Sequence, residues 1–171
     1  KDGKPAELLD LEGIALAGDG GFWLASEGNP EREKNKTRST LIRIDAAGTI
    51  VEEIALPESF AANATRFGFE GVAVTGSGAD ETVWLAVQRE WKDDPKGMTK
   101  LLAYKPADKS WGAVHYPLDK GGRPRDCYDR ARAAAVELRA QTGRRPRRID
   151  VARYVYGNNP QASDSLRGCL R

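Results

Sequence analysis

Three glutamates along the chain could do chemistry together, and two of them stand at matching places. Glu12 and Glu70 each precede a glycine, in Glu-Gly-Ile-Ala and Glu-Gly-Val-Ala, and Glu27 follows the apolar run that begins at Trp23. Carboxylates are ligands that calcium prefers, and a bound cation can polarise a phosphoryl oxygen or help to form a nucleophilic water. The same glutamates could instead accept backbone hydrogen bonds at a recurring corner where a strand begins. The residues alone leave both interpretations open.

Two arginines lie close to these acids in the sequence. Arg66 and Arg89 can each hold a phosphate through the planar fork of the guanidinium group, and Gln88 stands next to Arg89. A salt bridge to a neighbouring glutamate is the simpler role for either arginine. His115 is the only histidine, and the chain contains no Gly-x-Ser-x-Gly motif, so a serine hydrolase of the usual kind is not expected.

The candidate residues belong to an internal repeat with a period of about sixty residues. Glu70 follows Glu12 by 58 positions, and Trp84 follows Trp23 by 61 positions. A near-constant offset, with insertions only at turns, is typical of repeat proteins. The two copies span residues 8–62 and 63–120.

Each copy is expected to form four short strands, because apolar runs alternate with turn residues. The predicted strands cover residues 13–17, 21–26, 41–45 and 49–55 in the first copy, and 71–75, 82–88, 100–104 and 111–116 in the second. The polar stretches 28–38 and 89–98 are expected to be solvated loops. A four-stranded antiparallel unit of this length is a blade of a β-propeller or part of a sandwich, and the repeat favours the propeller.

Two blades are fewer than the roughly four to eight that close a propeller ring. We therefore expect that the chain is a piece of a larger propeller or that its open blades associate with a partner. The predicted fold class is all-β, an incomplete propeller of two antiparallel blades within residues 1–120. An eight-stranded sandwich of two sheets is the structural alternative.

The composition changes at residue 121. Residues 121–171 hold 12 Arg, no Lys and 5 acidic residues, whereas all ten Lys lie in the first 120 residues. Apolar residues at helical spacing predict a helix over 126–141 in this basic tail. Cys127 and Cys169 both fall in the tail, either paired or free. The arginines at 144–148 resemble no known nucleic-acid module, and no apolar run approaches the ~18 residues of a membrane span, so neither kind of partner is expected.

Several motifs occur in a fixed order over residues 8–119: DLEGIA, DGGFWLASE, LIRID, GFEGVAV and LAVQ. Together they resemble the phytase-like propeller family, described as having esterase-like activity of phytase. The resemblance implies a periplasmic or secreted β-propeller that hydrolyses esters, above all phosphoric esters. It also implies calcium held by acidic residues around the central channel, at positions that match Glu12, Glu27 and Glu70, with Gln88 beside them.

The predicted function is therefore hydrolysis of a small ester, chiefly a phosphoester, with calcium as the expected cofactor. Glu12, Glu27 and Glu70 are the predicted catalytic and metal-binding residues, and Arg66, Gln88 and Arg89 the predicted substrate-binding residues. The alternative is a non-catalytic propeller fragment that serves as a binding or assembly module. In that case self-association through the open blade edges is the expected interaction.

Overall fold

The protein is represented by a computed structural model that describes residues 9–118. These residues belong to the first of two compact units of the chain, which covers residues 1–135. The predicted basic tail over 121–171, its helix over 126–141 and both cysteines lie outside the described residues.

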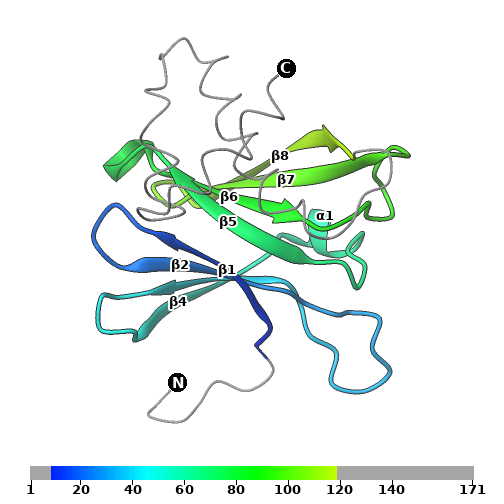
Figure 1. Ribbon diagram of the computed structural model, residues 1–171, viewed down its shortest axis with the longest axis horizontal. Helices are drawn as coiled ribbons and strands as arrows, with labels where there is room; N and C mark the ends of the chain where they lie inside the picture. Colours follow the sequence, from blue (N-terminus) through cyan, green and yellow to red (C-terminus); the bar gives the residue numbers. More distant parts are fainter. Residues whose placement is uncertain (1–8, 119–171) are drawn as a thin grey trace, which may run out of the picture. The chain divides into compact units, whose positions relative to one another are not determined.

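Two four-stranded antiparallel sheets make up the described fold (Figure 1). Within each sheet every strand pairs with the next one along the chain, which is the arrangement of a propeller blade. The first sheet contains β1 (Leu11–Leu16), β2 (Phe22–Ser26), β3 (Thr40–Ile44) and β4 (Ile50–Ala55). The second contains β5 (Phe69–Thr75), β6 (Thr82–Val87), β7 (Met98–Lys105) and β8 (Ser110–Pro117). The fold is all-β, with two blade-like repeats, as predicted.

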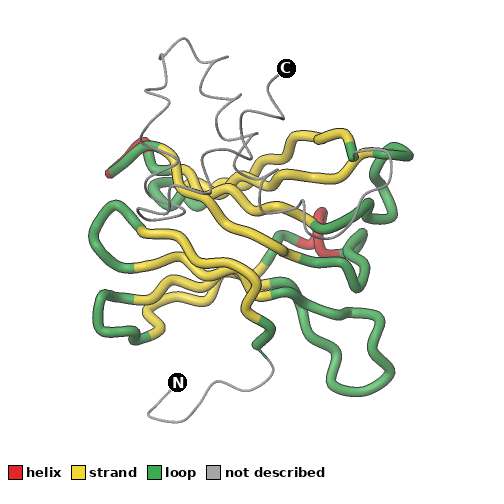
Figure 2. The backbone as a smooth tube through the Cα atoms, viewed as in Figure 1, coloured by secondary structure: helices red, strands yellow, loops and turns green. Residues whose placement is uncertain are grey.

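Every predicted strand is present, with ends within two residues of those expected. Two short helical segments, α1 (Glu58–Ala61) and η1 (Gly78–Asp80), were not predicted and lie in connections (Figure 2). Neither they nor any other helix among residues 9–118 has the length and apolar character needed to cross a membrane.

Turn chemistry explains why the strands end where they do. In the hairpin between β3 and β4, a carboxylate oxygen of Asp45 accepts the backbone N–H groups of Ala47 and Thr49 at 2.9 and 2.8 Å. Gly48 has a φ of 85°, a conformation that costs glycine little and other residues more. The turn therefore fixes the pairing of β3 with β4.

The main apolar core lies between the two sheets. Its members come from both repeats, and the ring of Trp23 on β2 meets the ring of Tyr104 on β7 edge to face, with centroids 6.1 Å apart. The inner strands β1 and β5 also contact each other. A Cβ at Gly13 would lie 2.9 Å from the backbone nitrogen of Val72, so this close approach needs glycine. The glycine after Glu12 thus has a packing role.

The expectation of two solvated loops is correct for the first loop and only partly correct for the second, where residues 92, 93, 95 and 96 are exposed. Residues 31–36 are exposed, whereas Trp91 is buried and the side chain of Asp94 is 0% exposed. Lys100 on β7 is buried beside them and contacts Asp94 and, at 2.7 Å, Asp93. His115 on β8 completes this cluster through a 3.0 Å contact with Asp94. Asp93 and Asp94 anchor this loop to the sheet because they pair with charged or polar side chains on β7 and β8.

Candidate functional site

Glu12 and Glu70 occupy the same backbone irregularity in the two repeats. The register of β1 with β2 passes from Leu11 directly to Gly13, and that of β5 with β6 passes from Phe69 directly to Gly71. Each glutamate is therefore the extra residue of a β-bulge, a device that bends a strand and redirects a side chain. The recurring Glu-Gly corner expected from the sequence is real. At each bulge the glutamate side chain departs from the regular alternation of side chains between the two faces of the sheet.

Glu27 and Gln88 take equivalent places one residue beyond the ends of β2 and β6. The backbone N–H of Glu27 donates to the carbonyl of Asp10 at 2.7 Å, and that of Gln88 donates to the carbonyl of Gly68 at 3.0 Å. These matching bonds show that three positions of the first repeat are equivalent to three positions of the second. These are Asp10, Glu12 and Glu27 in the first repeat, and Gly68, Glu70 and Gln88 in the second.

The three acids of the first repeat form a compact group. One carboxylate oxygen from each of Asp10, Glu12 and Glu27 lies within 4.8 Å of the others, and Asp10 and Glu12 are exposed to solvent. Calcium binds six to eight oxygens, supplied largely by carboxylates and completed by carbonyls or waters. A group of three clustered carboxylates with open solvent beside it fits that requirement. We call these residues the acid group.

The second sheet supplies a backbone donor to this group. The N–H of Gly68 donates to Oε1 of Glu27 at 2.9 Å. A Cβ at Gly68 would lie 2.7 Å from Oγ of Ser39 and 2.9 Å from Cγ of Glu27. Burial raises the pKa of Glu27, the bond from Gly68 opposes that rise, and the charges of Glu12 and Asp10 add to it. Only a residue without a side chain leaves room for Glu27 here.

The peptide group that donates to Glu27 is held from its other side. The indole N–H of Trp91 donates to the carbonyl of Phe67 at 2.9 Å, and this carbonyl belongs to the same peptide unit as the N–H of Gly68. The backbone N–H of Trp91 in turn donates to Oδ2 of Asp94 at 2.7 Å. Hydrogen bonds in such a chain polarise one another. Buried Trp91, in the loop after β6, therefore helps to orient Glu27.

Glu70 lies outside the compact group but within its electrostatic reach. Burial is the largest cause that raises its pKa, to about 7, and the negative charges of Glu27, Glu12 and Asp10 add to the rise. Nε2 of Gln88 donates a hydrogen bond to Oε1 of Glu70. A carboxyl group of this kind changes its protonation state near neutral pH.

A pocket of about 220 Å³ adjoins the acid group and brings positive charge to it. Its lining contains two members of the acid group and two arginines; the lining residues are Leu9, Asp10, Glu27, Gly28, Asn29, Arg32, Thr37 and Arg66. The pocket therefore offers carboxylates and guanidinium groups to a single bound molecule.

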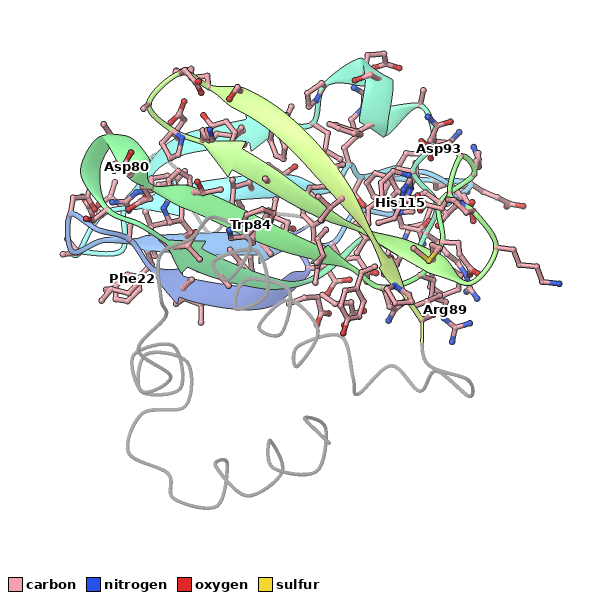
Figure 3. All side chains as sticks on the ribbon, turned by 90° about the horizontal axis from the view of Figure 1, so that it is seen from above. Phe22, Asp80, Trp84, Arg89, Asp93 and His115 are labelled. Atoms are coloured by element: carbon pink, nitrogen blue, oxygen red, sulfur yellow. The ribbon has the colours of Figure 1, made fainter. Side chains whose placement is uncertain are left out.

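Arg66 and Arg89 both lie over the ring of Phe67, with guanidinium carbons 4.6 and 4.8 Å from its centroid. This contact holds the two exposed side chains near each other. Arg66 reaches the pocket, and Arg89 is not among the residues that line it. Figure 3 shows Arg89 at the same end of the second sheet as Asp93 and His115, and Asp80 at the opposite end.

The structure brings some of the expected residues together and adds others. Glu12 and Glu27 meet in the acid group, Arg66 joins Glu27 in the pocket, and Glu70 bonds to Gln88. Sequence reasoning missed three contributors: Asp10, Arg32 and Gly68. Asp10 had a signal, since it precedes Glu12 by two residues in the first motif. Gly68, its counterpart in the second repeat, acts through the backbone, which residue type does not reveal.

Comparison with known proteins gave one match. A family model described as phytase-like, esterase-like activity of phytase, matches residues 1–145. Neither the curated proteins nor the solved structures gave a match. The matched span contains every residue of the acid group and the pocket, and it reaches beyond the 8–119 over which the sequence motifs were recognised.

Proposed function

The chain belongs to the phytase-like family described by esterase-like activity of phytase, and on that basis we propose that it hydrolyses phosphoric esters with calcium held by the acid group. The family description supports a hydrolase of the esterase-like class. The choice of a phosphoester and of calcium is the part that we propose.

One observation carries this proposal: the acid group and the arginine-lined pocket share Asp10 and Glu27. A phosphoester is an anion, so it needs positive charge close to any carboxylates that take part in its hydrolysis. A cation on the acid group and the guanidinium groups of Arg32 and Arg66 would provide that charge from two sides. A neutral ester would need neither.

Asp10, Glu12 and Glu27 are the residues that would hold calcium. When bound, calcium would polarise a phosphoryl oxygen and make a coordinated water more acidic. The bond from the Gly68 N–H fixes one oxygen of Glu27, so the carboxylate does not have to become ordered when an ion arrives.

The other residues of the site have roles that follow from their chemistry. Arg66 and Arg32 would bind the non-bridging oxygens of the phosphate, because the planar guanidinium fork matches two oxygens at once. Glu70, with a pKa of about 7, can accept or donate a proton at neutral pH, and Gln88 orients it.

The first test is calcium binding, measured by titration calorimetry separately from any activity. Glu27→Gln and Asp10→Asn should each weaken calcium binding by at least about tenfold, as expected when a ligand is lost. The matched control is Glu33→Gln, which removes the same charge from an exposed loop position and should leave the affinity unchanged. Equal affinity in all variants would rule out the acid group as the calcium site.

The second test separates the ester classes. The purified chain should hydrolyse p-nitrophenyl phosphate in calcium and lose this activity in chelator. Arg66→Gln should raise KM for p-nitrophenyl phosphate and leave p-nitrophenyl acetate unaffected, because only the phosphate needs the guanidinium charge. Turnover of the acetate without turnover of the phosphate would overturn the phosphoester assignment and leave the broader esterase-like description.

A further inference from the structure

One buried hydroxyl group in the described part of the chain has no hydrogen-bond partner. Ser39, which directly precedes β3, is only 3% exposed, and its Oγ is the one buried side-chain polar atom of residues 9–118 that is unpaired within that range. An unpaired polar group in the interior lowers stability, because water no longer solvates it. Such groups are rare in folded proteins. The hydroxyl of Ser39 is therefore a donor with an unused hydrogen bond.

This hydroxyl lies next to the acid group. Oγ of Ser39 and Cγ of Glu27 border the same small space beside Gly68, because a Cβ on Gly68 would lie 2.7 Å from the first atom and 2.9 Å from the second. The carboxylate of Glu27 accepts the N–H of Gly68 at 2.9 Å. A carboxylate has about four sites that can accept a hydrogen bond. Glu27 thus has acceptor capacity left beside the unused donor.

Ser39 has a counterpart in the second repeat. Leu41 pairs with the alanine two residues after the repeated tryptophan of β2, and Leu101 pairs with the equivalent alanine of β6. The residues two places before these leucines, Ser39 and Thr99, are therefore equivalent. They are 3% and 2% exposed. Both repeats thus have a hydroxyl group at the same buried position.

The hydroxyl of Thr99 shows what this position does in the second repeat. Oγ1 of Thr99 donates to the carbonyls of Val87 and Arg89, at 2.8 and 3.2 Å. These two carbonyls lie on either side of Gln88, which takes the place of Glu27 in the second repeat. The hydroxyl therefore holds the chain around Gln88. In the first repeat the residue at that place is Glu27, and the hydroxyl beside it is unpaired.

We propose that Ser39 is a positioning residue of the acid group, and that its hydroxyl donates to the carboxylate of Glu27 when calcium is bound. This inference rests on the proposed function, because it concerns the same calcium site. A rotation about the Cα–Cβ bond of Ser39 is enough to redirect the hydroxyl. The N–H of Gly68 and the hydroxyl of Ser39 would then both hold Glu27, and donors of this kind fix a metal ligand in the orientation that binds.

Ser39 then has opposite effects on stability and on calcium binding. Ser39→Ala removes an unpaired buried group, so in chelator its melting temperature should equal or exceed that of the wild-type chain. Its calcium affinity should fall by about tenfold, as is usual when a residue that orients a metal ligand is lost. A residue with only a structural role would lower the melting temperature and leave the affinity unchanged.

The test uses the full chain, with calcium binding measured by titration calorimetry and melting curves recorded in chelator. Thr99→Val is the matched control, because it removes the equivalent hydroxyl from the second repeat together with its two bonds. Thr99→Val should melt at a lower temperature than the wild-type chain and bind calcium equally well. In saturating calcium, the carbon-13 shift of the Glu27 carboxyl should change in Ser39→Ala and stay unchanged in Thr99→Val.

The outcomes separate this inference from the calcium assignment itself. Equal calcium affinity in Ser39→Ala and the wild-type chain would overturn the role of Ser39 and leave the acid group as the calcium site. A wild-type chain that binds no calcium would overturn both. A Ser39→Ala chain that melts well below the wild-type chain in chelator, or that fails to fold by circular dichroism, would show that the hydroxyl acts in the calcium-free fold and would also overturn the inference.

Discussion

Trp23 and Glu81 join the two sheets through a buried hydrogen bond. The indole N–H of Trp23 on β2 donates to Oε1 of Glu81 at 2.9 Å, and the other carboxylate oxygen accepts the backbone N–H of Gly18 at 2.8 Å. Glu81 is only 8% exposed. A single carboxylate of the second sheet therefore satisfies two donors of the first, one from a side chain and one from the backbone.

Replacing Glu81 should uncouple the sheets. Glu81→Ala leaves the Trp23 indole and the Gly18 N–H without their acceptor, and each unpaired buried donor costs about 1–3 kcal/mol. We expect the free energy of unfolding to fall by about 2–4 kcal/mol in urea titrations. Glu81→Gln keeps one acceptor oxygen and should cost less than half as much. Equal losses for both variants would show that the hydrogen bonds are not the cause.

A methyl group at Gly68 should disturb the acid group directly. Gly68→Ala places a Cβ 2.7 Å from Oγ of Ser39 and 2.9 Å from Cγ of Glu27, so Glu27 must move. We expect a loss of about 1–3 kcal/mol in stability and weaker calcium binding by calorimetry. Gly112→Ala is the matched control, because nothing lies within 4 Å of the new methyl group. Unchanged calcium affinity in Gly68→Ala would contradict the role given to this contact.

Glu70 should make stability depend on pH. Its pKa is raised from the ordinary 4.5 to about 7 in the folded protein, so the folded state holds the proton more tightly than the unfolded state. Its contribution is therefore greatest below pH 4.5 and declines as the pH rises to about 7. The decline should be about 1 kcal/mol, because water screens a half-buried carboxyl. Urea titrations from pH 4.5 to 8 should show a shallower decline in Glu70→Gln.

Calcium should reverse part of this effect. A cation on the acid group favours the charged form of a nearby carboxylate, so the pKa of Glu70 should fall when calcium is added. Carbon-13 NMR titration of the Glu70 carboxyl, with calcium and then with chelator, measures this shift. A pKa that stays near 7 in saturating calcium would place the ion elsewhere.

Lys100 and Lys109 should differ sharply although both form ion pairs. Lys100 is buried and pairs with Asp94, whose side chain is 0% exposed, whereas Lys109 pairs with Glu52 on the surface at 3.1 Å. Lys100→Ala leaves a buried carboxylate without its cation, and we expect a loss of about 3 kcal/mol or more. Lys109→Ala should cost less than about 1 kcal/mol. Thermal unfolding of the two variants side by side makes the comparison.

The internal repeat was sufficient to predict the two sheets, but it gave no information on contacts between distant parts of the chain. The offset between Trp23 and Trp84 predicted two equivalent sheets because strand periodicity and turn residues are local signals. The anchoring of the loop around Asp94 depends on Lys100 and His115, which come from other strands. A charged loop that pairs with distant charges reads in sequence like any solvated loop.

The sequence predicted those members of the candidate site that contribute through a side chain at a recognisable position. Glu12 stood out as an acid that the repeat duplicates, Glu27 as an acid at the end of an apolar run, and Arg66 as a nearby cation. The donor at Gly68 belongs to the backbone, and Arg32 reaches the pocket from a long loop, so neither has a signal in residue type. The periplasmic or secreted location stays a prediction.

The two repeats differ in their number of acidic residues at the site, and this difference determines how many cations the proposed site would hold. Where the first repeat has Asp10 and Glu27, the second has the uncharged Gly68 and Gln88, and the Gly68 backbone turns toward its neighbour's carboxylate instead of adding another charge. Two identical groups of carboxylates side by side would repel each other. The proposed calcium site therefore belongs to the first repeat, and the two described blades together would hold one cation.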